Sequence, residues 1–260
     1  MSQLNLISAF CICIAFTVFS LLPTAANPAG STGKNQGTQT IWELKQRDNN
    51  LGERTIWLSK NGFRALYKKS KYAITSQAPD WQLNFFNDDR QMIYTSSIPA
   101  YTKNLGLRAQ MLKASYLPDT YTTGTGEPAE IAGLKTKCVT VTRTGTNKES
   151  KVVKALYYFN DNIVPPPQME AFFATTFGKL ASRLALRIIV FNHHGRVIKL
   201  ETESAKKIQV PASFFDPPKG YRRAKSEDEV TLGVDLINDI VGDLGKQLGS
   251  DGRDLPAQKK

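Results

Sequence analysis

The feature that most constrains the fold is a series of six short segments, within residues 40–95, in which apolar and polar residues alternate. Residues that favour turns separate the segments, among them Asn49-Asn50 and Asp88-Asp89. Segments of this length and spacing predict an antiparallel β-meander. The predicted strands are residues 40–46, 54–60, 63–68, 72–77, 81–87 and 91–95.

The Asn61-Gly62 pair is the strongest hairpin signal in this series. Both central positions of a type I′ turn need positive φ, which asparagine and glycine tolerate, so the pair predicts such a turn. In the strand before it, Ile56 and Leu58 share one face and are separated by Trp57. The predicted sheet therefore has one apolar face, which must be covered by another element.

Two segments are candidate helices for this cover. Residues 105–117 carry apolar side chains near helical spacing, and residues 167–184 carry an aromatic stripe with steps of three and four residues. The prolines 165–167 favour a helix start at the second segment. We expect both stripes to pack on the sheet. The aromatic residues of the second stripe are Phe172, Phe173 and Phe177.

A further group of strands is predicted in the second half of the chain. Residues 134–143 and 152–159 predict two strands. Residues 184–192 are apolar and β-branched, His193-His194-Gly195 predicts a turn, and residues 196–204 alternate in character. This last stretch is expected to form a second hairpin.

The chain leaves that hairpin through an aromatic and proline-rich exit at residues 210–221. The Pro217-Pro218 pair restricts the backbone there. We expect Phe214, Phe215 and Tyr221 to close the edge or mouth of the sheet.

The N-terminus has the character of an export signal. The first 26 residues contain no charged side chain, and residues 4–22 are mostly apolar. Pro23 ends this run, and small residues follow up to Ala26, so we expect cleavage near Ala26. An uncleaved membrane anchor is the alternative, because about 20 apolar residues span a bilayer. Residues 27–39 have the composition of a flexible linker.

The cysteine pattern favours a bacterial periplasm or cell envelope. Cys138 is the only cysteine after the predicted signal, so the exported chain can form no intramolecular disulfide. We expect Cys138 to be a buried or half-buried strand residue.

Residues 226–248 predict a C-terminal amphipathic helix. Ser226 and Glu229 have the spacing of a capping box, and Val230 begins an apolar stripe. We expect this helix to dock on its own domain, and the alternative is that it binds another protein or a membrane. Residues 249–260 are expected to be disordered.

The sequence contains no motif that indicates catalysis, a metal or a cofactor. His193 and His194 are the only histidines, and adjacent strand residues point to opposite faces, so they could not share a metal. A phosphate-binding glycine loop, a Gly-x-Ser-x-Gly elbow and a Cys-x-x-Cys pair are all missing. We therefore expect no catalytic residues, no metal ligands and no cofactor.

The formal net charge of +11 leaves two interpretations open. Lysines and arginines on exposed strands improve solubility and protect sheet edges. They would also attract an anionic membrane surface or an acidic envelope polymer. Nucleic acid is not expected, because the protein is predicted to be exported and its basic clusters lack interleaved aromatic residues.

Four motifs occur in an order that resembles a known family. They are residues 52–58, residues 131–138, the helix at 169–180 leading into Leu186-Arg187, and the closing residues 215–221. Together they resemble the LolA-like superfamily of bacterial lipoprotein-carrier relatives, and more closely the DUF4412-like group within it. The resemblance covers about residues 40–223.

This resemblance implies an α+β fold for residues 40–225: a strongly curved antiparallel half-barrel whose concave face is covered by helices. In carrier relatives that shape shelters acyl chains. None of the carriers' ligand-contacting arginines aligns with a position in this sequence, so the resemblance implies a fold and no site.

Our leading hypothesis is an exported, non-enzymatic protein that binds a hydrophobic or amphiphilic ligand, such as a lipid or lipoprotein acyl chain, between sheet and helices. The alternative is an envelope structural or adaptor protein that binds a partner through its basic surface and C-terminal helix, and a hydrolase is a third. The oligomeric state is not indicated. Candidate residues for the cavity lining or mouth are Met111, Phe172, Phe173, Phe177, Phe214 and Tyr221.

Overall fold

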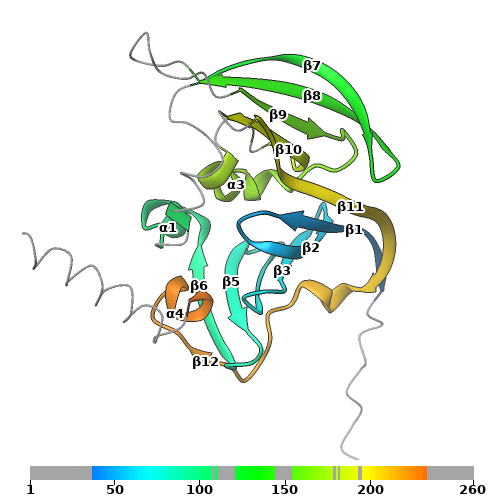
Figure 1. Ribbon diagram of the computed structural model, residues 1–260. Helices are drawn as coiled ribbons and strands as arrows, with labels where there is room; N and C mark the ends of the chain where they lie inside the picture. The colour runs from blue at the N-terminus through cyan, green and yellow to red at the C-terminus, as the bar shows by residue number, and fades with distance from the viewer. Residues whose placement is uncertain are drawn as a thin grey trace, which may run out of the picture. The chain divides into compact units, whose positions relative to one another are not determined.

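The fold is built on one large sheet. The computed structural model describes residues 37–106, 109–110, 121–143, 154–177, 180, 182–192 and 195–232. These residues form a 12-stranded sheet with the order β12-β6-β5-β4-β3-β2-β1-β11-β10-β9-β8-β7. The sheet is open and curved, and it is antiparallel except where β12 pairs with β6 (Figure 1). The predicted curved antiparallel sheet is confirmed.

The elements have the following bounds. The strands are β1 (Thr38–Asp48), β2 (Gly52–Ser59), β3 (Gly62–Tyr67), β4 (Tyr72–Gln77), β5 (Gln82–Asn87), β6 (Met92–Ser97), β7 (Tyr121–Ile131), β8 (Leu134–Arg143), β9 (Lys154–Phe159), β10 (Ala185–Asn192), β11 (Gly195–Pro211) and β12 (Arg222–Arg223). The helices are α1 (Ile98–Lys103), η1 (Pro167–Met169), α3 (Glu170–Phe177), η3 (Ala212–Phe215) and α4 (Glu227–Thr231).

Strands β1 to β6 form the predicted meander, each pairing with the next in the chain. The meander begins at Thr38, inside the segment expected to be linker, because Thr38 pairs with Pro211 of β11. The alternation of apolar and polar residues, with turn residues between the segments, was therefore enough to predict these strands and their pairing in chain order.

The connection between β2 and β3 differs from the predicted type I′ turn. Ser59 pairs with Gly62, so Lys60 and Asn61 form the two-residue connection. Neither Asn61 nor Gly62 has a positive φ. A Cβ atom on Gly62 would instead overlap the ring of Phe215. The glycine at this position is required by the close approach of an aromatic ring and not by the backbone angle.

β7 was not predicted as a strand. It contains Gly124, Gly126 and Pro128, residue types that are depleted in strands, and it lies at the edge of the sheet. The register with β8 shifts between Gly126 and Ala129, which places Pro128 in the irregular part of the pairing. A proline is tolerated in such a position because no ladder hydrogen bond is needed there.

The predicted helix at residues 167–184 is shorter in the structure. It consists of η1 followed by α3, which ends at Phe177, and Leu184 comes directly before β10. α1 was missed because it has only six residues. Ser97 caps it by accepting a hydrogen bond from the Ala100 amide. Most of the predicted helix at 105–117 lies outside the described residues, although Ala109 and Gln110 are helical.

β11 is longer than the predicted strand at residues 196–204, because it pairs with two neighbours. Its first half pairs with β10, as the predicted hairpin requires, and its second half pairs with β1. β11 thereby joins the meander to the strands of the second half of the chain. The turn residues His193 and His194 lie outside the described residues.

The C-terminal helix is described only at its start. Ser226 accepts a hydrogen bond from the Glu229 amide at 3.3 Å, as a capping box predicts, but the Glu229 carboxylate accepts from the Lys225 amide at 2.8 Å rather than from that of Ser226. The predicted signal peptide, most of the linker, the rest of this helix and the tail lie outside the described residues. The adaptor hypothesis, which depends on this helix, stays a prediction.

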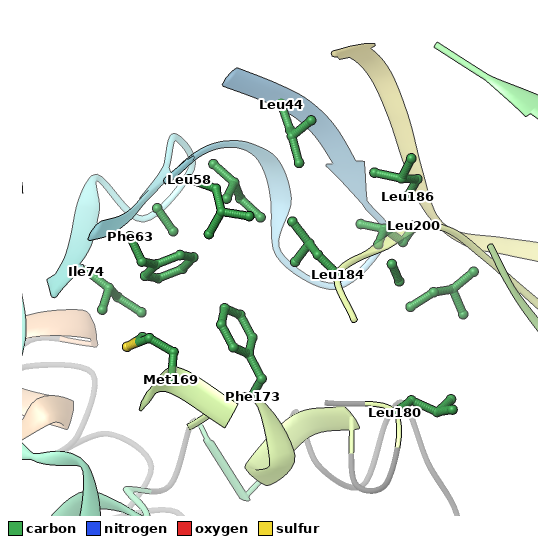
Figure 2. Close-up of a cluster of buried hydrophobic side chains, with 14 of the residues drawn as sticks. Leu44, Leu58, Phe63, Ile74, Met169, Phe173, Leu180, Leu184, Leu186 and Leu200 are labelled. Atoms are coloured by element: carbon green, nitrogen blue, oxygen red, sulfur yellow. The ribbon is translucent and has the colours of Figure 1, made fainter. Parts of the chain in front are cut away.

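Two hydrophobic clusters lie on opposite faces of the meander. Ile56 and Leu58 belong to the larger cluster, whereas Trp57 between them packs against the smaller one, and successive strand residues point to opposite faces. In the larger cluster, Met169 and Phe173 point from the helical segment toward the strands (Figure 2). The smaller cluster consists of Ile41, Val210 and Phe215, with Trp57, Ile208 and Phe214 packed against it.

Candidate functional site

Two of the predicted site residues, Phe172 and Phe173, lie on α3 in the larger cluster. Their ring centroids are 6.1 Å and 5.2 Å from that of Phe63 on β3. Phe172 also lies 5.5 Å from Tyr101 on α1. These contacts connect the two helices to the same face of the meander. Met111 and the side chain of Phe177 lie outside the part of the chain that the structure describes.

The other two predicted site residues, Phe214 and Tyr221, lie on the opposite face. The Phe214 ring is 5.5 Å from Trp57, and the Tyr221 ring is 6.4 Å from Phe86. The Arg64 guanidinium lies 5.4 Å from the rings of both Phe86 and Phe214. The exit segment therefore crosses the outer face of the sheet, and the structure does not bring these two residues together with Phe172 and Phe173.

Arg64 holds the exit segment on this face by hydrogen bonding as well. Its Nη1 donates to the carbonyl of Phe214 at 3.1 Å, and burial lowers the pKa of its guanidinium group. The Tyr221 hydroxyl donates to Asp88 at 2.8 Å, which raises the pKa of Tyr221. These residues therefore have a structural role.

A groove with mixed character lies where β1, β2 and β11 approach the segment that follows β9. It has a volume of about 360 Å³. We call it the Trp42 groove. It is lined by Thr40, Ile41, Trp42, Leu58, Ser59, Lys60, Asn162, Val164 and Lys207. The size falls within the usual range of small-molecule sites.

Trp42 forms a fixed wall of this groove. Its indole Nε1 donates to the carbonyl of Asn162 at 3.1 Å, so the polar end of the ring is satisfied. The Lys207 Nζ lies 5.3 Å from the ring centroid, within the range of a cation–π contact. The ring also packs against the larger hydrophobic cluster. These three contacts restrict the rotamer of Trp42 without any ligand.

The groove exposes apolar surface. Leu58 is buried beneath it, whereas Val164 is 50% exposed. Within the described residues, Val164 and Ile198 are the exposed large hydrophobic side chains. Trp42 and Val164 thus bring apolar area to the surface beside a concave site, which is typical of a place where an apolar group binds.

The charge of the groove is positive. Lys60 and Lys207 are exposed and line it, and none of the described residues that line it carries a carboxylate. The neighbouring Lys206 lies on the other face of β11, where its Nζ is 3.2 Å from Glu43. Burial raises the pKa of Glu43, but hydrogen bonds from Trp57 and Lys206 outweigh burial and leave the pKa lowered. The Glu43 carboxylate is therefore occupied on the opposite face.

A buried polar network lies elsewhere on the sheet. The Arg54 Nε donates to Gln46 at 2.9 Å, and the Arg54 Nη1 lies 3.6 Å from the Asp48 carboxylate. Gln46 donates to Thr202 at 2.9 Å and to the carbonyl of Ala185 at 3.1 Å. These bonds join β1, β2, β10 and β11. The network satisfies its members internally, so its role is to hold four strands together.

The described residues contain no group of three or more His, Cys, Asp or Glu side chains that could hold a metal ion. Over the same ranges, none of the helices has the length and apolar character needed to cross a membrane. Cys138 is buried on β8, as predicted.

Sequence reasoning missed the groove residues for a simple reason. Trp42, Leu58, Val164 and Lys207 come from four separate segments, and none forms a motif with its sequence neighbours. Val164 is apolar in a short polar and proline-rich stretch after β9, but its exposure is known only from the structure.

No protein-family model matches the sequence, and no curated protein does. The chain therefore has no support for membership of the DUF4412-like group.

Several solved structures are similar to the chain. An uncharacterized conserved protein from Thermus thermophilus has a TM-score of 0.39 at 8% identity, over 71% of this chain and 89% of that one. The MucA/MucB complex from Pseudomonas aeruginosa has a TM-score of 0.34 at 11% identity, over 74% and 59%. A LolA superfamily protein from Nitrosomonas europaea has a TM-score of 0.25 at 11% identity, over 70% and 91%.

One of these similar structures is of a protein from the LolA superfamily, which the sequence motifs resemble. Similarity at these TM-scores does not define a shared site, so a function has to be inferred from the chain's own residues.

Proposed function

We propose that this chain is an exported, non-enzymatic binding protein that holds an amphiphilic molecule, with the apolar part of the ligand in the Trp42 groove. The observation that carries the proposal is the cavity of about 360 Å³ in which the exposed Val164 and the ring of Trp42 form apolar walls over the buried Leu58. A cavity of this size accommodates one alkyl chain segment and excludes a folded protein domain.

The groove adjoins the face that the helices contact. Trp42 and Leu58 belong to the same hydrophobic cluster as Phe173 of α3 and Tyr101 of α1. The apolar floor of the groove therefore belongs to the same cluster that α1 and α3 contact. In this proposal the alkyl chain packs on that floor, and Phe172 and Phe173 belong to the packed core and not to the described lining of the groove. Phe214 and Tyr221 have no part in binding.

The test uses lysophosphatidylcholine, a single-chain amphiphile without net charge, below its critical micelle concentration. We expect the full chain to bind it and the Val164→Glu variant to lose about tenfold or more in affinity, because a carboxylate in the apolar wall must be desolvated. Isothermal titration calorimetry measures both affinities. Ile198→Glu is the matched control, since Ile198 is 41% exposed and does not line the groove.

The control also separates binding from stability. Both substitutions place a carboxylate at an exposed hydrophobic position, so both should leave the thermal midpoint nearly unchanged. Equal affinities for the wild type and both variants would place any bound lipid elsewhere. Failure of the wild type to bind would refute the proposed function.

A further inference from the structure

We propose that Lys60 and Lys207 form a head-group subsite, and that the amphiphile bound in the Trp42 groove is an anionic lipid. This inference rests on the proposed function and specifies the chemical class of its ligand. It comes from where these two charges lie relative to the apolar walls, and not from the basic character of the whole chain.

Lys207 reaches the groove because of its register. It lies directly opposite Trp42 in the pairing of β1 with β11, so both side chains leave the same face of the sheet. Its Nζ lies 5.3 Å from the centroid of the Trp42 ring. The ring thus holds an ammonium group next to the surface on which an alkyl chain would pack. One side of the groove therefore presents apolar area and positive charge together.

Lys60 brings a second charge from a different element. It is the first residue of the connection between β2 and β3, two positions after Leu58, and it lines the same cavity. The two ammonium groups are thus anchored to separate parts of the sheet. The carbonyl of Asn162 is already used by Trp42, and the remaining polar groups of the lining are neutral.

These two lysines are not neutralised by an ion pair, unlike four other lysines of the described ranges. Lys68, Lys71, Lys137 and Lys206 each lie within ion-pair distance of a carboxylate. Within the described ranges, no carboxylate lies at such a distance from Lys60 or Lys207. The positive electrostatic potential of these two ammonium groups is therefore not neutralised by an ion pair and can attract an anion in the groove.

A ligand that complements this site needs an alkyl chain joined to an anionic group. Its alkyl chain packs on Trp42, Leu58 and Val164, and its anionic group lies at the rim between the two ammonium groups. A lipid with a phosphodiester or carboxylate head group has this arrangement. A neutral or zwitterionic head group would find the same apolar walls but no net attraction at the rim.

The experiment compares lysophosphatidylglycerol with lysophosphatidylcholine of the same acyl chain, each titrated into the full chain. We expect the wild type to prefer the anionic lipid by about tenfold, the sum of two exposed charge contacts. The double variant Lys60→Gln and Lys207→Gln should lose this preference and bind both lipids alike, because it removes the charges that distinguish them. Measurable binding of lysophosphatidylcholine by the double variant shows that the apolar part of the site is intact.

Lys206→Gln is the matched control. It removes the same charge from the same strand, but on the face away from the groove, where Lys206 pairs with Glu43. The control should keep the preference for the anionic lipid. If Lys206→Gln loses as much preference for the anionic lipid as Lys207→Gln does, the attraction belongs to the whole basic surface. The proposed head-group subsite would then be wrong.

The remaining outcomes separate the two proposals. Equal binding of both lipids by the wild type overturns the head-group subsite and leaves the proposed function standing. Binding of neither lipid overturns both. Loss of binding to both lipids in the double lysine variant would assign these residues to the integrity of the groove, and would overturn a role in selecting charge.

Discussion

Replacing Gly62 with alanine should destabilise the protein through a single contact. Gly62 is the first residue of β3, and a Cβ atom there would overlap the ring of Phe215 in the exit segment. That ring is 1% exposed and lies 5.3 Å from the Phe214 ring, so it has little room to move. Thr75 fixes the backbone behind it by donating to the Phe215 carbonyl at 2.6 Å.

The expected magnitudes follow from this packing. Gly62→Ala alone should cost about 1–3 kcal/mol, as overpacking of a filled core does. Phe215→Ala alone should cost about 3–5 kcal/mol. In the Phe215→Ala background, the ring atoms that would overlap Cβ are gone. Gly62→Ala should then be neutral or stabilise by about 0.4–1 kcal/mol, because alanine restricts the unfolded chain.

The two substitutions should therefore be coupled by about 1–4 kcal/mol, the difference between the costs of Gly62→Ala in the two backgrounds. Urea denaturation followed by circular dichroism, on the wild type, both single variants and the double variant, measures this coupling energy. Gly133→Ala is the control. Gly133 has φ of +76°, and a Cβ atom added to it would meet nothing within 4 Å, so its cost should be the same with Phe or Ala at position 215.

The result that would refute this reasoning is additivity. If Gly62→Ala lowers the free energy of unfolding by the same amount with Phe or Ala at position 215, the contact with the Phe215 ring is not the cause. The glycine would then be needed for the backbone of the turn, as the Asn61-Gly62 pair suggested.

Two further predictions concern stability. Arg54→Met should cost about 3–5 kcal/mol of folding free energy, because it removes a buried cation beside the Asp48 carboxylate. Arg47→Met removes a cation from an exposed ion pair and should cost less than about 1 kcal/mol. Equal urea midpoints for the two variants would contradict the buried network. Burial, and then Glu227, raise the pKa of Tyr101 above its ordinary value of 10.0. The neutral form is therefore favoured in the folded state, so the contribution of Tyr101 to stability should be constant below pH 10 and fall above it by about 1.4 kcal/mol per pH unit. Urea midpoints across that range should show a smaller loss in Tyr101→Phe, and an unchanged loss would exclude this residue as the cause.

The regular strands could be predicted because their signal is local. Alternation with turn residues between the segments identified β1 to β6, strand patterns on either side of a polar turn identified β8 and β9, and an apolar and β-branched run identified β10. β7 escaped because Gly124, Gly126 and Pro128 disfavour strands, and pairing with β8 together with the irregular register overcomes that preference. The length of β11 escaped because it depends on pairing with β1, which is distant in sequence.

The candidate site could be predicted only in part. The aromatic stripe on α3 was recognised, and Phe172 and Phe173 do lie in the larger cluster. The exit aromatics were expected at the edge or mouth of the sheet, and in the structure Phe214 packs on the outer face. The face on which a segment docks depends on how the chain crosses the sheet after β11, and no local pattern encodes that path.

The sequence by itself determined the conformation of most strands and the position of Cys138 in a buried strand, because these follow from the side-chain period along a few residues. Only the tertiary structure decided which residues form the Trp42 groove and which face the exit segment covers. Trp42 meets Leu58 through the pairing of β1 with β2 and Lys207 through the long-range pairing of β1 with β11, and Val164 joins them from the segment after β9. The curvature and register of a 12-stranded sheet arise from contacts summed over the whole domain, and a binding site made by them has no local signature.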